Sequence, residues 1–508
     1  MHSQEVTRKS VRSLFPRSFH NAVTLVGLSI AVVALGLIAF LFVLELFARH
    51  SNPYLGLITF LVLPVFVLIG GILAVVGVVR EHRSLRAGKQ PSDVLLSRID
   101  LSDPKQRKAF TLFAVVGMLL LGTSAFMSYQ AYEYTESVNF CGLLCHKVMA
   151  PEYVAYRSSP HARVSCVQCH IGPGTTWFVR SKLSGLYQVY ATVTNTYPQP
   201  IPTPIHNLRP ARETCEQCHW PRYFAGEKLQ ARTYFMPDQH NTRHRLDLLM
   251  KIGGGNTDQG ASYGIHWHMN ITNEVTYAVL DRERMLIPWV QVKTADGSTT
   301  VYRSTEIAAS EAQIRTAEKR LMDCIDCHNR PAHIFNHPNR LVNLAMAENR
   351  ISPALPQVRD IAERALTKSY GSGPEAKDAI RRSIEEFYRA GHPEIWSAKK
   401  ADIEKTTKQV QQMYSRNFFP EMNVDWKAFQ DNLGHMYYVG CFRCHDGKHV
   451  SDDGKVLSKD CQTCHTILAQ QHGDSELRAS LDGVEFRHPA NVGEAWKETN
   501  CSDCHGEK

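Results

Sequence analysis

Three long apolar segments lie near the N-terminus and set the first expectation for the fold. Residues 22–44, 55–79 and 109–129 contain no Asp, Glu, Lys or Arg over 23, 25 and 21 positions. A helix of about 20 apolar residues is long enough to cross the hydrocarbon core of a bilayer. The first segment is too long for a signal peptide and lacks a small-residue cleavage site near its end. The pattern therefore predicts three transmembrane helices.

The basic residues around these segments predict their orientation. Arg8, Lys9, Arg12 and Arg17 precede the first segment, only Arg49 lies in the first loop, and eight Lys or Arg residues lie in the second loop. Basic loops remain in the cytoplasm. We therefore expect a cytoplasmic N-terminus and a periplasmic location for everything after the third segment.

The same bias explains the charge of the whole chain. Residues 1–108 hold 13 Lys or Arg and 6 Asp or Glu, a net charge of +7 out of a total of +8. The other 400 residues are close to neutral, so the basic balance reports membrane topology and gives no indication of nucleic-acid binding.

Polar and apolar positions after residue 130 predict a few further elements. Val290 and Val292 alternate with polar neighbours, Asp296-Gly297 follows, and residues 300–303 return, which predicts one β-hairpin. Residues 354–416 show the helical period, with apolar positions 358, 361, 362 and 365 on one face. The part after residue 130 also holds seven cysteine pairs, each followed directly by a histidine, and six of them have the C-x-x-C-H spacing that attaches haem c. We therefore expect a mostly α, membrane-anchored multihaem cytochrome c, whose haem-rich periplasmic part has little regular structure apart from one small β-hairpin.

Four segments describe this expectation. Residues 1–131 form the three-helix anchor, and residues 132–345 form a tetrahaem domain with an insertion at about 220–320. Residues 346–430 form a helical connector, and residues 431–508 form a C-terminal trihaem module.

The cysteines carry the strongest chemical signal. All 14 cysteines fall into seven pairs, and a histidine directly follows the second cysteine of each pair. Six pairs have the C-x-x-C-H spacing that attaches haem c, whereas Cys141 and Cys145 are separated by one extra residue. Zinc sites or disulfides would not require a histidine after every pair. The pattern predicts seven covalently bound haem c groups, with the motif histidine on the iron.

The predicted attachment residues are Cys141, Cys145, Cys166, Cys169, Cys215, Cys218, Cys324, Cys327, Cys441, Cys444, Cys461, Cys464, Cys501 and Cys504. The motif histidines are His146, His170, His219, His328, His445, His465 and His505.

Thirteen further histidines in the exported part compete for the second axial positions. Closeness to a motif favours His161, His333, His435 and His449, followed by His472 and His488. His266 and His268 are left open, and His392 is interpreted as a surface or capping residue. Ligation by two histidines saturates an iron and suits electron transfer.

Residues 141–337 resemble the NapC/NirT family of membrane-anchored multihaem quinol dehydrogenases. The matching pieces are CHKVMAPEY, His161 before CVQCH, ETCEQCH and CIDCHNRPAH, preceded by an apolar segment. The resemblance implies quinol oxidation at the outer face of the cytoplasmic membrane. It also implies a methionine ligand for the first haem, at Met149, so that His146 and Met149 remain alternatives there.

The same resemblance implies a quinol site near Lys182, twelve residues after His170. An acidic residue seven positions further on takes part in some members, but position 189 is valine here, between Gln188 and Tyr190. Lys182, Gln188 and Tyr190 are therefore the quinol-site candidates, and the proton acceptor is left open. A basic residue resting at the membrane surface is the alternative interpretation of Lys182.

The overall plan resembles heptahaem inner-membrane cytochromes of metal-respiring bacteria. It implies a quinol dehydrogenase that passes electrons from menaquinol or another quinol, through seven haems, to periplasmic c-type cytochromes in anaerobic or extracellular metal respiration. The expected partners are lipid, the quinone pool and those cytochromes, and homo-oligomerisation is left open. The alternatives are reverse flow towards quinone, a pure electron carrier, and a terminal reductase of a small oxyanion.

Overall fold

The chain divides into two compact units. The computed structural model describes residues 21–47, 62–88, 103–144, 146–172, 174–205, 208–254, 263–270 and 272–506. Unit 1 comprises Met1–Glu136 and Pro173–Thr176, and unit 2 comprises Ser137–Gly172 and Trp177–Lys508.

Unit 1 contains the three predicted apolar helices. They are α1 (Ala22–Phe47), α3 (Leu63–Arg86) and α4 (Pro104–Thr135), and each is long and apolar enough to cross a membrane. The prediction of three long apolar helices is confirmed, and that they cross a membrane stays a prediction. Residues 55–61 of the second predicted segment lie outside the described part of the chain. α3 and α4 extend beyond the predicted apolar segments, because the charged residues next to those segments are also helical. Asp103 caps the N-terminus of α4, where its side chain accepts a hydrogen bond from Lys105 N at 2.9 Å.

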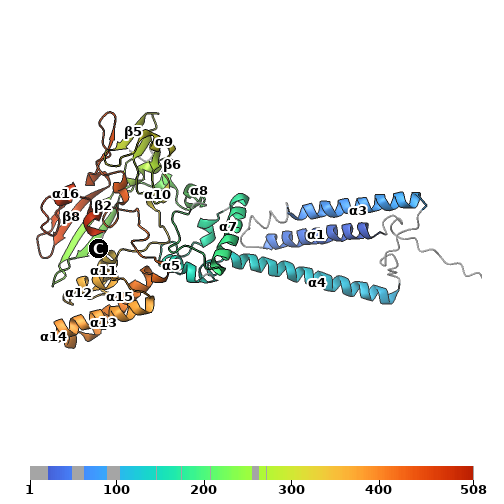
Figure 1. Ribbon diagram of the computed structural model, residues 1–508, viewed down its shortest axis with the longest axis horizontal. Coiled ribbons are helices and arrows are strands. Elements are labelled where there is room, and N and C mark those ends of the chain that lie inside the picture. The colour runs from blue at the N-terminus through green and yellow to red at the C-terminus, as the bar shows by residue number, and fades with distance from the viewer. Residues whose placement is uncertain are drawn as a thin grey trace, which may run out of the picture. The chain divides into compact units, whose positions relative to one another are not determined.

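Glycine brings α1 and α3 together, side by side in Figure 1. A Cβ at Gly70 would meet Gly27 O at 2.6 Å and Ala31 N at 2.7 Å, so the backbones approach each other too closely for a larger residue. Asn21 Nδ2 donates to Gly77 O at 3.2 Å across the same contact. Small residues and interhelical hydrogen bonds are the usual means of association for helices in lipid.

Unit 2 combines short helices around the cysteine motifs with a group of longer helices. The first group is η4 (Phe140–Leu144), α5 (His146–Arg157), α6 (Cys166–His170), α7 (Thr175–Val193), α8 (Ala211–Cys215), η5 (Pro221–Tyr223), η7 (Ile265–Met269), α9 (Glu311–Thr316) and α10 (Cys324–Cys327). The second is α11 (Pro338–Ala347), α12 (Val358–Thr367), α13 (Gly373–Gly391), α14 (Pro393–Ala398) and α15 (Lys400–Asn417). Then come η8 (Pro420–Met422), η9 (Gly440–Arg443), η10 (Cys461–Thr463), α16 (Ala495–Glu498) and α17 (Cys501–His505).

The longer helices build an aliphatic core. α11, α12, α13 and α15 bury a shared cluster that includes Val342, Ile361, Ile380, Ile384 and Val410. The helical period predicted for residues 354–416 is present in α12, α13 and α15, and Figure 1 shows these helices gathered at one end of unit 2. Burial of this apolar surface stabilises the helices against one another.

Two antiparallel sheets complete unit 2. One has the order β1 (Lys228–Phe235), β2 (Arg243–Met250), β8 (His465–His472), β9 (Arg478–Ala479). The other has the order β6 (Glu318–Leu321), β3 (Glu274–Val279), β4 (Trp289–Lys293), β5 (Thr299–Ser304), β7 (His449–Ser451).

The predicted hairpin is present as β4 and β5, but the expectation of one small hairpin underestimated the β structure. Strands from the insertion pair with strands near the C-terminus, β2 with β8 and β5 with β7. Such distant pairing has no local turn signal, so a hairpin search could not detect it. The division of the exported part at residues 345 and 430 stays a prediction.

Candidate haem centres

Six motif histidines each lie opposite one histidine from outside the motifs. The ring centroids are 6.2 Å apart for His170 and His333, 6.0 Å for His219 and His161, 6.3 Å for His328 and His266, 5.9 Å for His445 and His268, 6.2 Å for His465 and His435, and 6.0 Å for His505 and His488. Two imidazoles that bind one metal from opposite sides, through bonds of about 2 Å, have centroids about 6 Å apart. The six pairs therefore fit a haem iron.

Hydrogen bonds fix the tautomer of several of these rings. Nδ1 of His161 donates to Pro331 O at 3.1 Å, and Nδ1 of His266 donates to Ile252 O at 2.8 Å. His268 and His445 make the same contact with Ile265 O and Ser458 O, at 2.8 and 3.1 Å. A carbonyl on Nδ1 leaves Nε2 as the nitrogen that can bind iron, which is the usual arrangement around metal-bound histidine.

His333 has a charged partner in addition. Its Nδ1 lies 3.0 Å from Glu152 O and 3.1 Å from Glu152 Oε2. Arg330 holds this group in place, because its Nη2 lies 3.6 Å from Glu152 Oε1 and its Nε donates to His333 O at 3.0 Å. The Arg330 guanidinium is packed over Phe429, and burial lowers its pKa while Glu152 opposes that shift.

The cysteines of the first four motifs lie near one another in chain order. A hydrogen bond with Cys141 is the main influence that lowers the pKa of Cys166 to about 7. Burial, followed by the charge of Cys215, raises the pKa of Cys169. A hydrogen bond with Cys215 is the main influence that raises the pKa of Cys324. Each motif is therefore close enough to the next for their thiols to interact.

The series continues to the C-terminus. Burial raises the pKa of Cys327 to about 11 and that of Cys464 to about 11, and in both cases the next influence is Cys441. Burial and then Cys461 raise the pKa of Cys501. Each of these motifs therefore also lies near the next one along the chain.

The first motif has a different backbone. Cys141 and Gly142 lie in η4, a π-helical turn, and Met149 is half-buried on α5. A π-turn closes over one residue more than an α-turn, which accommodates the extra residue of this motif. Gly142 is buried against the ring of Tyr153, which occupies the space of a Cβ. Cys145 lies outside the described residues.

Two favoured histidines, His449 and His472, have neighbours other than a motif histidine. His449 is fully buried, with Nδ1 2.9 Å from Asp446 Oδ1 and Nε2 2.8 Å from Ile287 O, so both ring nitrogens are engaged by protein groups. His472 lies opposite His244 across β2 and β8, with ring centroids 5.7 Å apart, and neither belongs to a motif. His392 follows α13 and its N donates to Tyr388 O, as expected of a capping position.

Sequence reasoning left His266 and His268 open, yet the structure gives both a motif histidine as neighbour. They lie on η7, a short 3₁₀ helix. Each of these two pairs joins histidines that are far apart in the chain. The only sequence signal for them was that the exported part has thirteen histidines outside the motifs, more than seven haems need.

The three quinol-site candidates lie on one helix, α7. Lys182 Nζ lies 5.0 Å from the centre of the Phe178 ring, and Gln188 Nε2 donates to Ser184 Oγ at 3.3 Å. Tyr190 is 62% exposed. Apolar residues at positions 179, 183, 186, 187 and 193 are also exposed, at the helical spacing of a single face. An exposed apolar helix face of this kind is suited to an apolar environment such as the membrane interface.

Comparisons with known proteins agree with this picture. Residues 103–201 match the NapC/NirT cytochrome c family, N-terminal region, a stretch that includes α4, the first two motifs and α7. The chain is 43% identical, over 486 residues, to the cytochrome c-type protein ImcH of Geobacter sulfurreducens, covering 96% of this chain and 95% of that protein. No solved structure matches the chain. With its three membrane-type helices, its cysteine motifs and this similarity over nearly its whole length, the chain belongs to the NapC/NirT family of membrane-type multihaem c-type cytochromes.

Proposed function

We propose that the chain binds seven haem c groups and oxidises quinol, passing electrons to periplasmic c-type cytochromes. The observation that carries the haem assignment is the set of six histidine pairs at iron-binding separation. In this assignment His333, His161, His266, His268, His435 and His488 are the second ligands of motifs two to seven, in that order. His146 or Met149 binds the first iron.

Six irons held from both sides are suited to electron transfer, because no coordination position is open for a substrate. The proximity of the cysteines of each motif to those of the next supports a path from motif one to motif seven. A terminal reductase would need an open iron, so electron transfer is the better-supported function. Haem supplies the one-electron chemistry, and the protein supplies ligands, spacing and charge.

Quinol enters near the first haem in this proposal. α4 ends at Thr135, six positions before Cys141, and the basic loops favour a periplasmic side for all that follows. The exposed apolar face of α7 is suited to the bilayer interface, where Lys182 would bind a quinol oxygen. Gln188 and Tyr190 supply further hydrogen-bonding groups one to two turns away.

Anaerobic addition of a reduced menaquinone analogue to the detergent-purified protein tests the proposal. We expect the haem absorbance to change to the reduced form, and Lys182→Ala to slow this change while all haems are retained. Arg180→Ala is the matched control, because Arg180 is an exposed cation on the same helix, packed over Trp177. Haems that stay oxidised with quinol but are reduced by dithionite contradict the quinol function.

The ligand assignment has its own test. His268→Ala should remove one low-spin bis-histidine signal from the electron paramagnetic resonance spectrum of the oxidised protein, whereas His449→Ala should leave all such signals. The reverse result would assign His449 to the fifth iron. The haem content per chain, measured by the pyridine haemochrome method, shows whether either variant has lost a haem.

A further inference from the structure

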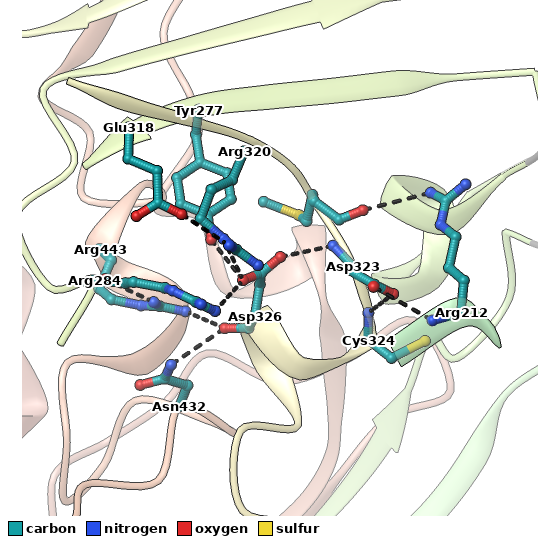
Figure 2. A network of polar contacts seen from close by, with 11 residues as sticks. Arg212, Tyr277, Arg284, Glu318, Arg320, Asp323, Cys324, Asp326, Asn432 and Arg443 are labelled. Atoms are coloured by element: carbon teal, nitrogen blue, oxygen red, sulfur yellow. Dashed lines mark hydrogen bonds and ion pairs between the residues drawn. The ribbon is translucent and has the colours of Figure 1, made fainter. Parts of the chain in front are cut away.

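The fourth and fifth motifs are joined by a buried polar network that haem attachment does not require. Asp326, inside motif four, is 2% exposed, and its Oδ1 accepts from Tyr277 Oη at 2.6 Å and from Arg284 Nη1 at 3.0 Å (Figure 2). Its Oδ2 accepts a hydrogen bond from Asp323 N at 2.7 Å, and this bond is part of the capping box at the start of α10. Arg320 Nε lies 3.6 Å from Oδ1 and adds a second positive charge. The carboxylate is thus fully satisfied despite its burial.

Arg443 is the counterpart inside motif five. Its Nη2 donates to Asp326 O at 2.6 Å, its Nη1 to Arg284 O at 2.9 Å and its Nε to Gly440 O at 2.9 Å. Asn432 Nδ2 donates to the same Asp326 carbonyl at 3.2 Å. The rigid guanidinium therefore joins the backbone of motif four, the insertion and motif five in one fixed geometry, as Figure 2 shows.

Arg443 belongs to motif five and donates a hydrogen bond to the backbone of motif four. The insertion contributes to the same junction a second time, because His266 and His268 on η7 face His328 of motif four and His445 of motif five. Because His266 and His268 are only two residues apart, a rigid surrounding would hold the fourth and fifth haems at a constant distance from each other.

We propose that Arg443, anchored through Asp326 and Arg284, is a positioning residue that fixes the fourth haem relative to the fifth and so sets the rate of electron transfer between them. The inference rests on the proposed function. His328 and His266 would hold the fourth iron and His445 and His268 the fifth, and bound haem would supply the chemistry of a one-electron transfer in which no bond is made or broken. The insertion between motifs three and four then has a role, since Tyr277, Arg284 and Arg320 all come from it.

Stopped-flow reduction of the full-length protein with the menaquinol analogue gives the first readout. In the Arg443→Gln variant we expect the absorbance to reach a plateau when four of the seven haems are reduced, followed by completion about tenfold slower than in the natural protein. A tenfold slowing corresponds to about 1.4 kcal/mol in the barrier. Arg389→Gln is the control, because Arg389 is 64% exposed on α13, where its ion pair with Glu385 is 4.0 Å long.

A second readout does not depend on quinol. Two ferric haems in fixed contact broaden each other's electron paramagnetic resonance signals, and Arg443→Gln should sharpen the signals of the pair that His268→Ala identifies. If quinol reduces no haem in the natural protein, the quinol function fails while this readout still tests the junction. Unchanged kinetics and unchanged spectra, with a lowered melting temperature, overturn the inference and leave only a structural network.

Milder variants cover the case in which Arg443→Gln loses haem. Arg443→Lys keeps the charge but cannot reach three carbonyls, and Asn432→Ala removes one of the two donors to Asp326 O. Both should slow the same phase, Asn432→Ala less than Arg443→Lys. If both retain seven haems and reduce like the natural protein, the proposal is rejected.

Discussion

The contact between Glu152 and His333 makes a quantitative prediction about the second haem. Glu152 Oε2 lies 3.1 Å from Nδ1 of His333, the ring opposite His170. A carboxylate beside a ligand histidine makes that ligand more basic and favours the ferric iron. Replacing Glu152 by Gln removes the charge and keeps the shape, so the reduction potential of this haem should rise.

The size of the shift follows from Coulomb's law. Iron bound at Nε2 of His333 would lie about 4 Å beyond Nδ1, which places it about 7 Å from the carboxylate oxygen. At an effective dielectric constant of about 20, a unit charge at that distance is worth about 2 kcal/mol. The Glu152 side chain is 17% exposed, so solvent screens it further, and we take about half. About 1 kcal/mol corresponds to about 40 mV for one electron.

A redox titration monitored by electron paramagnetic resonance follows the low-spin signals one by one. We expect one signal to move upwards by about 40 mV in Glu152→Gln and the others to stay in place. Glu386→Gln, on the exposed surface of α13, controls for the loss of a negative charge. A potential that is unchanged, or that falls, would refute the reasoning about the ligand pair His170 and His333.

Three further predictions concern stability and haem content. Gly70→Ala should lower the unfolding temperature in detergent by the equivalent of about 1–3 kcal/mol, because its Cβ meets the backbone of α1, whereas Gly71→Ala has open space and should not. Burial, aided by nearby cations, lowers the pKa of His337 to about 3. The unfolded chain therefore binds a proton below pH 6.5 that the folded chain does not, and stability should fall by about 1.4 kcal/mol per pH unit down to about pH 3. His337→Asn should reduce that slope in melts between pH 7 and 5. Gly142→Val should collide with Tyr153 and reduce the measured haem content by one per chain.

The sequence predicted what depends on local pattern. The apolar segments are long and uninterrupted, so α1, α3 and α4 were predictable from composition alone. The hairpin of β4 and β5 was predictable because Asp296-Gly297 lies between two alternating strands. Helices α12 and α13 were predictable because their buried positions repeat with the helical period.

Distant pairings were not predictable from position. His161 lies just before the second motif but faces His219 of the third, and His333 follows the fourth motif but faces His170 of the second. His449 has the same spacing after its motif as His333, yet Asp446 and Ile287 O engage its ring. The spacing along the chain shows only which motifs a histidine is near in sequence. The fold decides which motif histidine it faces.

The sheets change how the C-terminal motifs relate to the first four. The sequence predicted a C-terminal trihaem module after a helical connector. The structure pairs β8 with β2 and β7 with β5, so strands from the insertion lie beside strands that follow motifs five and six. Arg443 and Asp326 then fasten motif five to motif four within the same unit. Under the proposed function, an electron at the fourth haem would need no docking step to continue, because motif five is part of the same folded unit. This is the physical reason to look for rate-setting contacts between motifs four and five.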